Sequence, residues 1–116
     1  VTDAGTPAIS DPGAGLVAHI KKALPEAKIT PIPGPSALIS ALSAAGISSD
    51  SFTFLGYPPH KKGRQTFFKN LKKIEIRPIV LYESPHRLEK TFEALAETLG
   101  KEEEVIIAKE LTKIHE

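Results

Sequence analysis

The feature that most constrains the fold is a repeated alternation of strand-like runs and helical patterns along the chain. Strand-like runs lie at 27–30, 52–55, 78–82 and 104–108. Apolar residues recur at helical spacing within 12–24, 37–45, 67–74 and 85–99. Such alternation predicts an α/β architecture with a largely parallel sheet, helices on both faces, and ligands bound at the carboxyl ends of the strands.

The same patterns predict where helices start and which side chains form the core. Asp11 and Ser84 each precede a proline, and both can cap backbone N–H groups while the proline tolerates the first helical turn. The apolar positions on the inner faces are expected to be largely buried. These are Leu38, Leu42, Phe67, Leu71, Val80, Leu81, Phe92, Leu95 and Ile107.

A polar stretch near the middle of the chain predicts a domain boundary. Serine or aspartate fills every position of 48–51, so we divide the chain into domains 1–47 and 48–116. Val1 leads directly into a loop, and no strand-like run follows 105–108. We therefore expect a fragment that lacks flanking elements at both ends.

Composition narrows the classes of function. The chain has no cysteine, which excludes disulfides, thiolate metal sites and cysteine nucleophiles. No apolar run approaches the roughly 20 residues of a membrane span, and no signal-peptide pattern is present, so we expect a cytoplasmic protein without membrane contact. The net charge of +1 makes no general case for a polyanion partner, so any such case depends on local clusters.

One candidate ligand loop is the stretch 2–13, which follows an expected strand end and precedes a helix. Its glycines allow close approach of the backbone to a small polar ligand. It matches neither a Walker loop nor the dinucleotide-binding glycine pattern. Asp3 and Asp11 also fit a purely structural role as turn and helix caps, and the spacing alone leaves both interpretations open.

Two further polar regions lie at expected strand ends. The proline-rich loop 56–63 and the helix after it carry the basic residues His60, Lys61, Lys62, Arg64, Lys69, Lys72 and Lys73. Phosphate contact is one use of such charges, and a solvated surface is the other. The hexapeptide 82–87 contains Glu83, His86 and Arg87, which fit either an active site or an ordinary helix start with surface charges.

Four blocks, 2–13, 33–37, 82–87 and 109–116, occur in an order and at spacings that closely resemble the ribosomal RNA small-subunit methyltransferase I family, within the tetrapyrrole-methylase-like superfamily. The resemblance spans nearly the whole chain. It implies a class III S-adenosylmethionine-dependent methyltransferase fold, of which this chain covers the end of the N-terminal cofactor-binding domain and most of the C-terminal domain. It also implies a homodimer with the cofactor between the two domains.

The implied activity is methylation of a cytidine ribose 2′-hydroxyl in small-subunit (16S) ribosomal RNA, free or in the assembled subunit, with no metal. The residues that the resemblance places at S-adenosylmethionine are Asp3, Ala4, Gly5, Thr6, Pro7, Pro35, Ser36, Ala37, Glu110 and Thr112. Those expected to contact RNA are Lys61, Lys62, Arg64, His86 and Arg87.

A ribose hydroxyl is a poor nucleophile, so a general base or a nearby cation would assist the transfer. Glu83 and Lys61 are the expected catalytic residues, with His86 and Arg64 as further candidates. Because part of the cofactor pocket would precede Val1, we expect residues 1–116 alone to be inactive.

Two alternatives remain open. A methyltransferase of tetrapyrrole intermediates shares the fold and the cofactor, but its relatives usually have a Gly-Asp-Pro loop where this chain has Ala4, Gly5, Thr6 and Pro7. A non-catalytic RNA-binding homologue that keeps the fold is the other.

Overall fold

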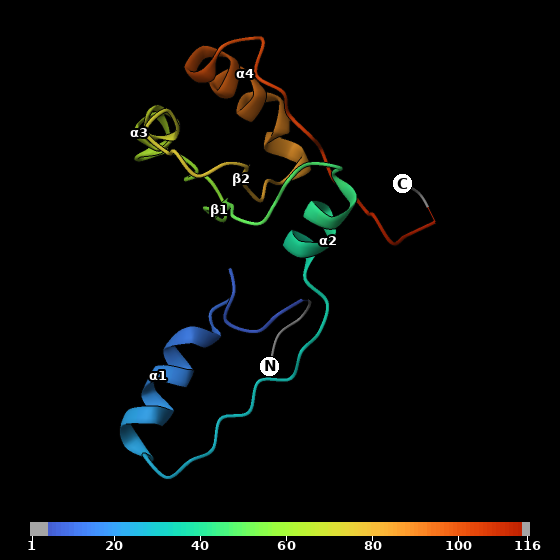
Figure 1. Cartoon of the computed structure of the whole chain (residues 1–116). Helices are drawn as coiled ribbons and strands as arrows, with labels where there is room; N and C mark the ends of the chain where they lie inside the picture. The colour runs from blue at the N-terminus through green and yellow to red at the C-terminus, as the bar shows by residue number, and fades with distance from the viewer. Residues whose placement is uncertain (1–4, 115–116) are drawn as a thin grey trace. The chain divides into compact units, whose positions relative to one another are not determined.

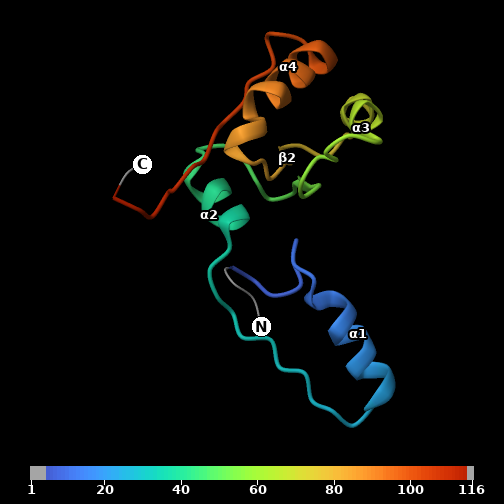
Figure 2. The same cartoon turned by 180° about the vertical axis from the view of Figure 1, so that it is seen from behind.

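The computed structural model describes residues 5–114 and divides the chain into two compact units, Val1–Ala44 and Ala45–Glu116 (Figures 1 and 2). The division lies close to the boundary expected after residue 47. That these units belong to two separate domains of the protein stays a prediction.

The first unit contains the helices α1 (Gly13–Ala23) and α2 (Ala37–Ala44). Asp11 stabilises the start of α1, since its Oδ1 accepts the Gly13 N–H at 3.0 Å. The helix begins one residue later than expected, and Pro12 occupies the N-cap position. Ser36 caps α2 by accepting the Ile39 N–H at 3.4 Å, and Leu38 and Leu42 are the buried face of that helix.

The prediction of a strand at 27–30 is wrong, because the described structure has no strand there. The stretch from 27 to 36 is neither helix nor strand, and Ile29 and Ile32 are exposed. A strand requires a hydrogen-bonded partner strand, and no strand of the described residues pairs with this stretch.

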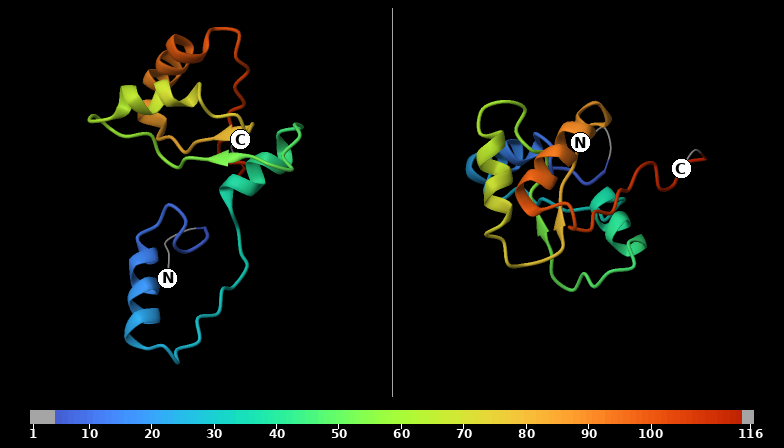
Figure 3. Two further views of the ribbon diagram at one scale, coloured as in Figure 1. Left: turned by 60° about the vertical axis from the view of Figure 1, so that its left-hand side comes forward. Right: turned by 90° about the horizontal axis from the view of Figure 1, so that it is seen from above.

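The second unit contains β1 (Thr53–Phe54), α3 (Arg64–Leu71), β2 (Ile79–Val80), the 3₁₀ turn η1 (Pro85–Arg87) and α4 (Leu88–Leu99). The two strands pair in parallel, with Thr53 opposite Ile79 and Phe54 opposite Val80 (Figure 3). A further bond, from the Tyr82 N–H to the Gly56 carbonyl at 2.8 Å, continues the pairing past the strand ends. The parallel pair and its helices agree with the predicted α/β class.

The core of this unit lies where α3 packs against α4, and Phe68 and Leu71 are its most buried apolar side chains. Of the nine expected core residues, Leu38, Leu42 and Leu71 are buried. Phe67, Val80, Leu81, Phe92 and Leu95 are half-buried. Ile107 is 58% exposed, so its predicted burial was wrong: 104–108 is not a strand in the described structure, and no sheet covers it.

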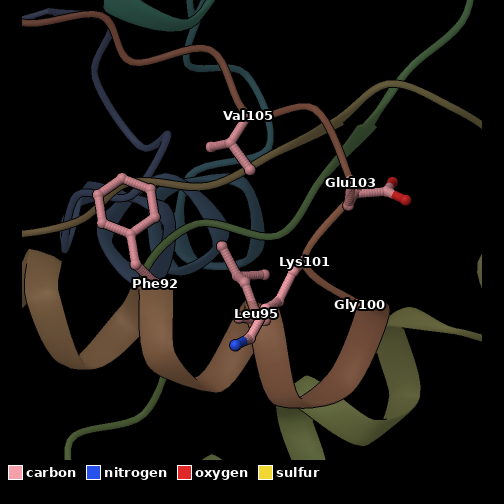
Figure 4. Close-up of a pocket in the computed structure, with 7 residues that line it drawn as sticks. Phe92, Leu95, Gly100, Lys101, Glu103 and Val105 are labelled. Carbon is pink, nitrogen blue, oxygen red and sulfur yellow. The ribbon is translucent and has the colours of Figure 1, made fainter.

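Gly100 caps the C-terminal end of α4. Its backbone has φ +106°, and its N–H donates to the Ala96 carbonyl at 3.1 Å. The chain that follows forms a mainly apolar pocket with the end of the helix. Figure 4 shows Phe92, Leu95 and Val105 lining it. None of the predicted site residues lines this pocket. Within residues 5–114, no helix is both long and apolar enough to cross a membrane.

Candidate functional site

Two of the predicted regions meet at the carboxyl ends of the paired strands. The loop 56–63 follows β1, the hexapeptide 82–87 follows β2, and the bond between Tyr82 and Gly56 joins them. Parallel pairing causes this, because the carboxyl ends of adjacent parallel strands lie at the same sheet edge. The strand-end argument from sequence therefore located a real cluster of polar side chains.

Glu83 lies at the centre of this cluster, and its side chain is only 7% exposed. One carboxylate oxygen, Oε1, accepts the Ser84 N–H at 2.7 Å and contacts Arg87 Nη2 at 2.7 Å. The other, Oε2, accepts the Thr91 hydroxyl at 2.6 Å and lies 3.7 Å from Arg64 Nη1. All four partners favour the charged carboxylate.

The protonation state follows from these contacts. Burial raises the pKa of the Glu83 carboxyl, but the hydrogen bonds from Thr91 and Ser84 and the charges of Arg87 and Arg64 outweigh it. The pKa is therefore held below its ordinary value of 4.5. A carboxylate with a lowered pKa and fully engaged oxygens is a weak proton acceptor at neutral pH, so the contacts favour a positioning role for Glu83; its catalytic role stays a prediction.

The two arginines of the cluster point inward. Arg64 donates to the Thr91 hydroxyl at 2.8 Å and to the Pro59 carbonyl at 3.3 Å, and its guanidinium lies 4.9 Å from the centre of the Phe68 ring. Arg87 donates to the Pro58 carbonyl at 3.3 Å. Both side chains are 17% exposed. Their expected contact with RNA is untested, but these bonds already engage their charges within the fold.

The other predicted RNA contacts are open to solvent. Lys61, Lys62 and His86 are exposed. His60, which is not one of the expected RNA contacts, is exposed beside Lys61, and His60, Lys61 and Lys62 are named here the basic loop. The Lys61 carbonyl accepts the Arg64 N–H at 3.3 Å, which closes a turn before α3. Tyr57 lies beside Tyr82, with ring centres 5.5 Å apart, and more than half of its surface is exposed.

The first unit brings two predicted cofactor stretches together. The Thr6 hydroxyl donates to the Pro35 carbonyl at 3.3 Å. Gly5 has φ +75°, a conformation that glycine adopts readily. Asp3 and Ala4 lie outside the described residues. Residues 5–7 and 35–37 are thus neighbours, as a shared ligand site would require.

The remaining cofactor candidates, Glu110 and Thr112, are exposed residues of the second unit. Glu110 has φ +52° and accepts the Lys113 N–H at 2.8 Å, so this part of the chain forms a turn. Their contact with the cofactor stays a prediction.

Sequence reasoning missed Thr91, which is 4% exposed on α4 and contacts both Glu83 and Arg64. A signal was available: Leu88 and Leu95 lie one turn before and one turn after Thr91, so a hydroxyl falls in an apolar stripe. Buried hydroxyls need hydrogen-bond partners, which points to a polar group beneath the helix. Among residues 5–114, no group of three or more metal-ligating side chains is placed to hold a metal ion.

Comparison with known proteins agrees with this architecture. The family model for Tetrapyrrole (Corrin/Porphyrin) Methylases matches residues 1–116. The proteins named "Ribosomal RNA small subunit methyltransferase I" of Vibrio cholerae and Escherichia coli O157:H7 are 47% and 45% identical, and each alignment covers 100% of this chain and 40% of the relative. The Thermotoga maritima protein of that name is 46% identical, over 100% of this chain and 50% of its own length.

The chain therefore spans half or less of the length of these relatives. Because the family model covers every residue, the chain belongs to the tetrapyrrole (corrin/porphyrin) methylase family.

Proposed function

We propose that the protein is an S-adenosylmethionine-dependent methyltransferase that methylates a cytidine ribose 2′-hydroxyl in small-subunit (16S) ribosomal RNA. The observation that carries the proposal is the 47% identity, over the whole chain, to a protein named for methylation of small-subunit ribosomal RNA. By the same resemblance, we expect a cytoplasmic homodimer that acts on the RNA or on the assembled subunit.

Residues 3–7 and 35–37 would hold the cofactor, together with Glu110 and Thr112. The described part of this set fits such a ligand. Gly5 leaves room for close approach of the backbone, and the start of α2 offers N–H groups suited to a carboxylate. When bound, S-adenosylmethionine supplies a methyl group that is already activated by its positively charged sulfur.

The acceptor oxygen of the ribose must lose its proton as it takes the methyl group. Lys61 is proposed to assist, because an exposed cation beside the hydroxyl would lower its pKa and allow water to accept the proton. Glu83 is the other proposed catalytic residue, although its contacts suit a positioning role better.

For the RNA itself, Lys61, Lys62 and His86 are exposed and available for phosphate contact. Arg64 and Arg87 belong to the same proposed surface, but they are turned toward Glu83 and the loop carbonyls. Holding donor and acceptor in line would account for much of the rate, since the leaving group needs no further activation.

A methylation assay on the full-length protein tests the proposal. Small ribosomal subunits that lack the modification would be incubated with radiolabelled S-adenosylmethionine, and the label located by nuclease digestion. Label on the 2′-oxygen of a cytidine is the expected result. Label on a porphyrinogen acid instead would establish the tetrapyrrole activity that the family description suggests. Cofactor binding without transfer to either acceptor would indicate a non-catalytic homologue.

A further inference from the structure

The hydroxyl of Thr91 occupies an unusual position between two charges of opposite sign. It donates to Glu83 Oε2 at 2.6 Å and accepts from Arg64 Nη2 at 2.8 Å, and the residue is 4% exposed. A hydroxyl suits this place because it carries both a donor and acceptor lone pairs. Valine, which has the same shape without the hydroxyl, would leave both charged groups one partner short.

The arginines of this cluster hold a particular piece of backbone. Arg87 donates to the carbonyl of Pro58 and Arg64 donates to the carbonyl of Pro59, each at 3.3 Å. Prolines have no N–H, so hydrogen bonds to the backbone of these residues can reach only their carbonyls. Each guanidinium group supplies a donor to one of these carbonyls.

The held backbone continues directly into the basic loop. Pro58 is fully buried, whereas His60, Lys61 and Lys62 are exposed. The Arg64 N–H also bonds to the Lys61 carbonyl at 3.3 Å, so the side chain and the main chain of Arg64 contact the backbone on either side of His60.

We propose that Arg64, Glu83, Arg87 and Thr91, named here the Glu83 cluster, act as positioning residues that fix the backbone of the basic loop and so present Lys61 and Lys62 to a polyanionic substrate. Thr91 sets the geometry, because its hydroxyl joins Glu83 to Arg64. A loop ordered in advance loses less entropy on binding, so ordering improves affinity without adding a contact. The identity of the substrate as RNA rests on the proposed function, but the ordering of the loop does not.

The test compares Thr91→Val and Thr91→Ser in the full-length protein. Thr98→Val is a matched control, because Thr98 lies two turns further along the same helix and its hydroxyl takes no part in the cluster. Two quantities are measured well below the unfolding temperature. They are amide hydrogen exchange at the Arg64 N–H, which closes the basic loop on the Lys61 carbonyl, and kcat/KM for methylation of small ribosomal subunits.

We expect Thr91→Val to speed exchange at the Arg64 N–H at least tenfold and to lower kcat/KM for the subunit at least fivefold. Thr91→Ser keeps the hydroxyl and should restore both quantities to within twofold, as should Thr98→Val. A merely structural role for Thr91 would lower the melting temperature and leave loop exchange below that temperature unchanged.

Unchanged loop exchange in folded Thr91→Val would overturn the proposal, whatever happens to activity. If that variant fails to fold, Arg87→Lys serves instead, since lysine keeps a charge beside Glu83 but lacks the planar fork that reaches both Glu83 and Pro58. Only the loop-exchange criterion then applies to it, because Arg87 also belongs to the proposed RNA surface. Exchange needs no substrate, so an enzyme that never methylates RNA would refute the proposed function while the exchange data still decide the role of the cluster.

Discussion

The carboxylate of Glu83 joins three separate segments of the second unit through four partners. Ser84 and Arg87 belong to the hexapeptide, Thr91 to α4 and Arg64 to α3. The sequence indicated a polar residue at a strand end, and that was right. It could not indicate that Arg64, distant along the chain, would share the same carboxylate, because that contact depends on the packing of α3 against α4.

The stability of the fold should depend on the charge of Glu83. Its folded pKa is lowered, so its contribution is present above the ordinary pKa of 4.5 and is lost as the pH falls through the folded value. Glu83→Gln should therefore reduce the free energy of unfolding by about 2 kcal/mol at pH 7. Urea unfolding at pH 7, 5.5 and 3.5 measures this.

The deficit of Glu83→Gln should be the same at pH 7 and 5.5 and should shrink at pH 3.5, where the unfolded parent protein takes up a proton. Glu93→Gln, at an exposed position of α4, is the control and should change little at any pH. A deficit that stays constant down to pH 3.5 would show that the charge of Glu83 is not what stabilises the cluster.

The lysines of the basic loop permit a second test. If Lys61 and Lys62 contact phosphates, replacing both by glutamine should flatten the salt dependence of RNA binding by about 0.7 per lost contact on a single strand. Lys90→Gln, at an exposed position of α4, should leave the slope unchanged. Binding titrations at several salt concentrations give the slopes, and equal slopes for parent and double variant would remove these lysines from the RNA surface.

At the scale of elements, helices were predicted better than strands, for a physical reason. The signals for α2, α3 and α4 are local: apolar spacing, a capping serine at 36 and a terminal glycine at 100. A strand exists only when another segment pairs with it. The runs 52–55 and 78–82 contain strands that pair with each other, whereas 27–30 and 104–108 have no partner strand among the described residues.

The end of α4 offers a prediction at this scale. Gly100 has φ +106° and ψ 162°, a combination available almost only to glycine. Gly100→Ala should therefore cost about 1–3 kcal/mol of unfolding free energy. Gly15→Ala, within α1 where an added Cβ meets nothing, should stabilise that helix by about 0.5–1 kcal/mol. Thermal unfolding of both variants measures the contrast, and a neutral Gly100→Ala would refute the conformational argument.

At the scale of the whole molecule, the rule that ligand loops follow the carboxyl ends of parallel strands correctly predicted that the loop 56–63 and the hexapeptide 82–87 lie together. In the first unit, a hydrogen bond from the Thr6 hydroxyl to the Pro35 carbonyl joins two of the predicted cofactor stretches. The sequence did not show that both arginines point inward, because side-chain direction depends on which carbonyls the folded loop presents. Thr91 is different, because its position in an apolar stripe of α4 could be read from the sequence.

The length of the relatives leads to a prediction for the chain by itself. Residues 1–116 correspond to 40% of the Vibrio cholerae relative, and the proposed cofactor site draws on several separate segments. We expect isothermal titration calorimetry to show that residues 1–116 bind S-adenosylmethionine at least tenfold more weakly than the full-length protein. Equal affinities would place the whole cofactor site within this chain.

The exposed run 105–107 also affects the solubility of the chain and its tendency to self-associate. Three successive β-favouring side chains, which belong to no strand of the described structure, offer a template for intermolecular strand addition. A net charge of +1 provides little long-range repulsion between copies. Residues 1–116 in isolation are therefore prone to concentration-dependent self-association through this run, and a single gatekeeper charge, as in Ile106→Lys, would raise their colloidal stability.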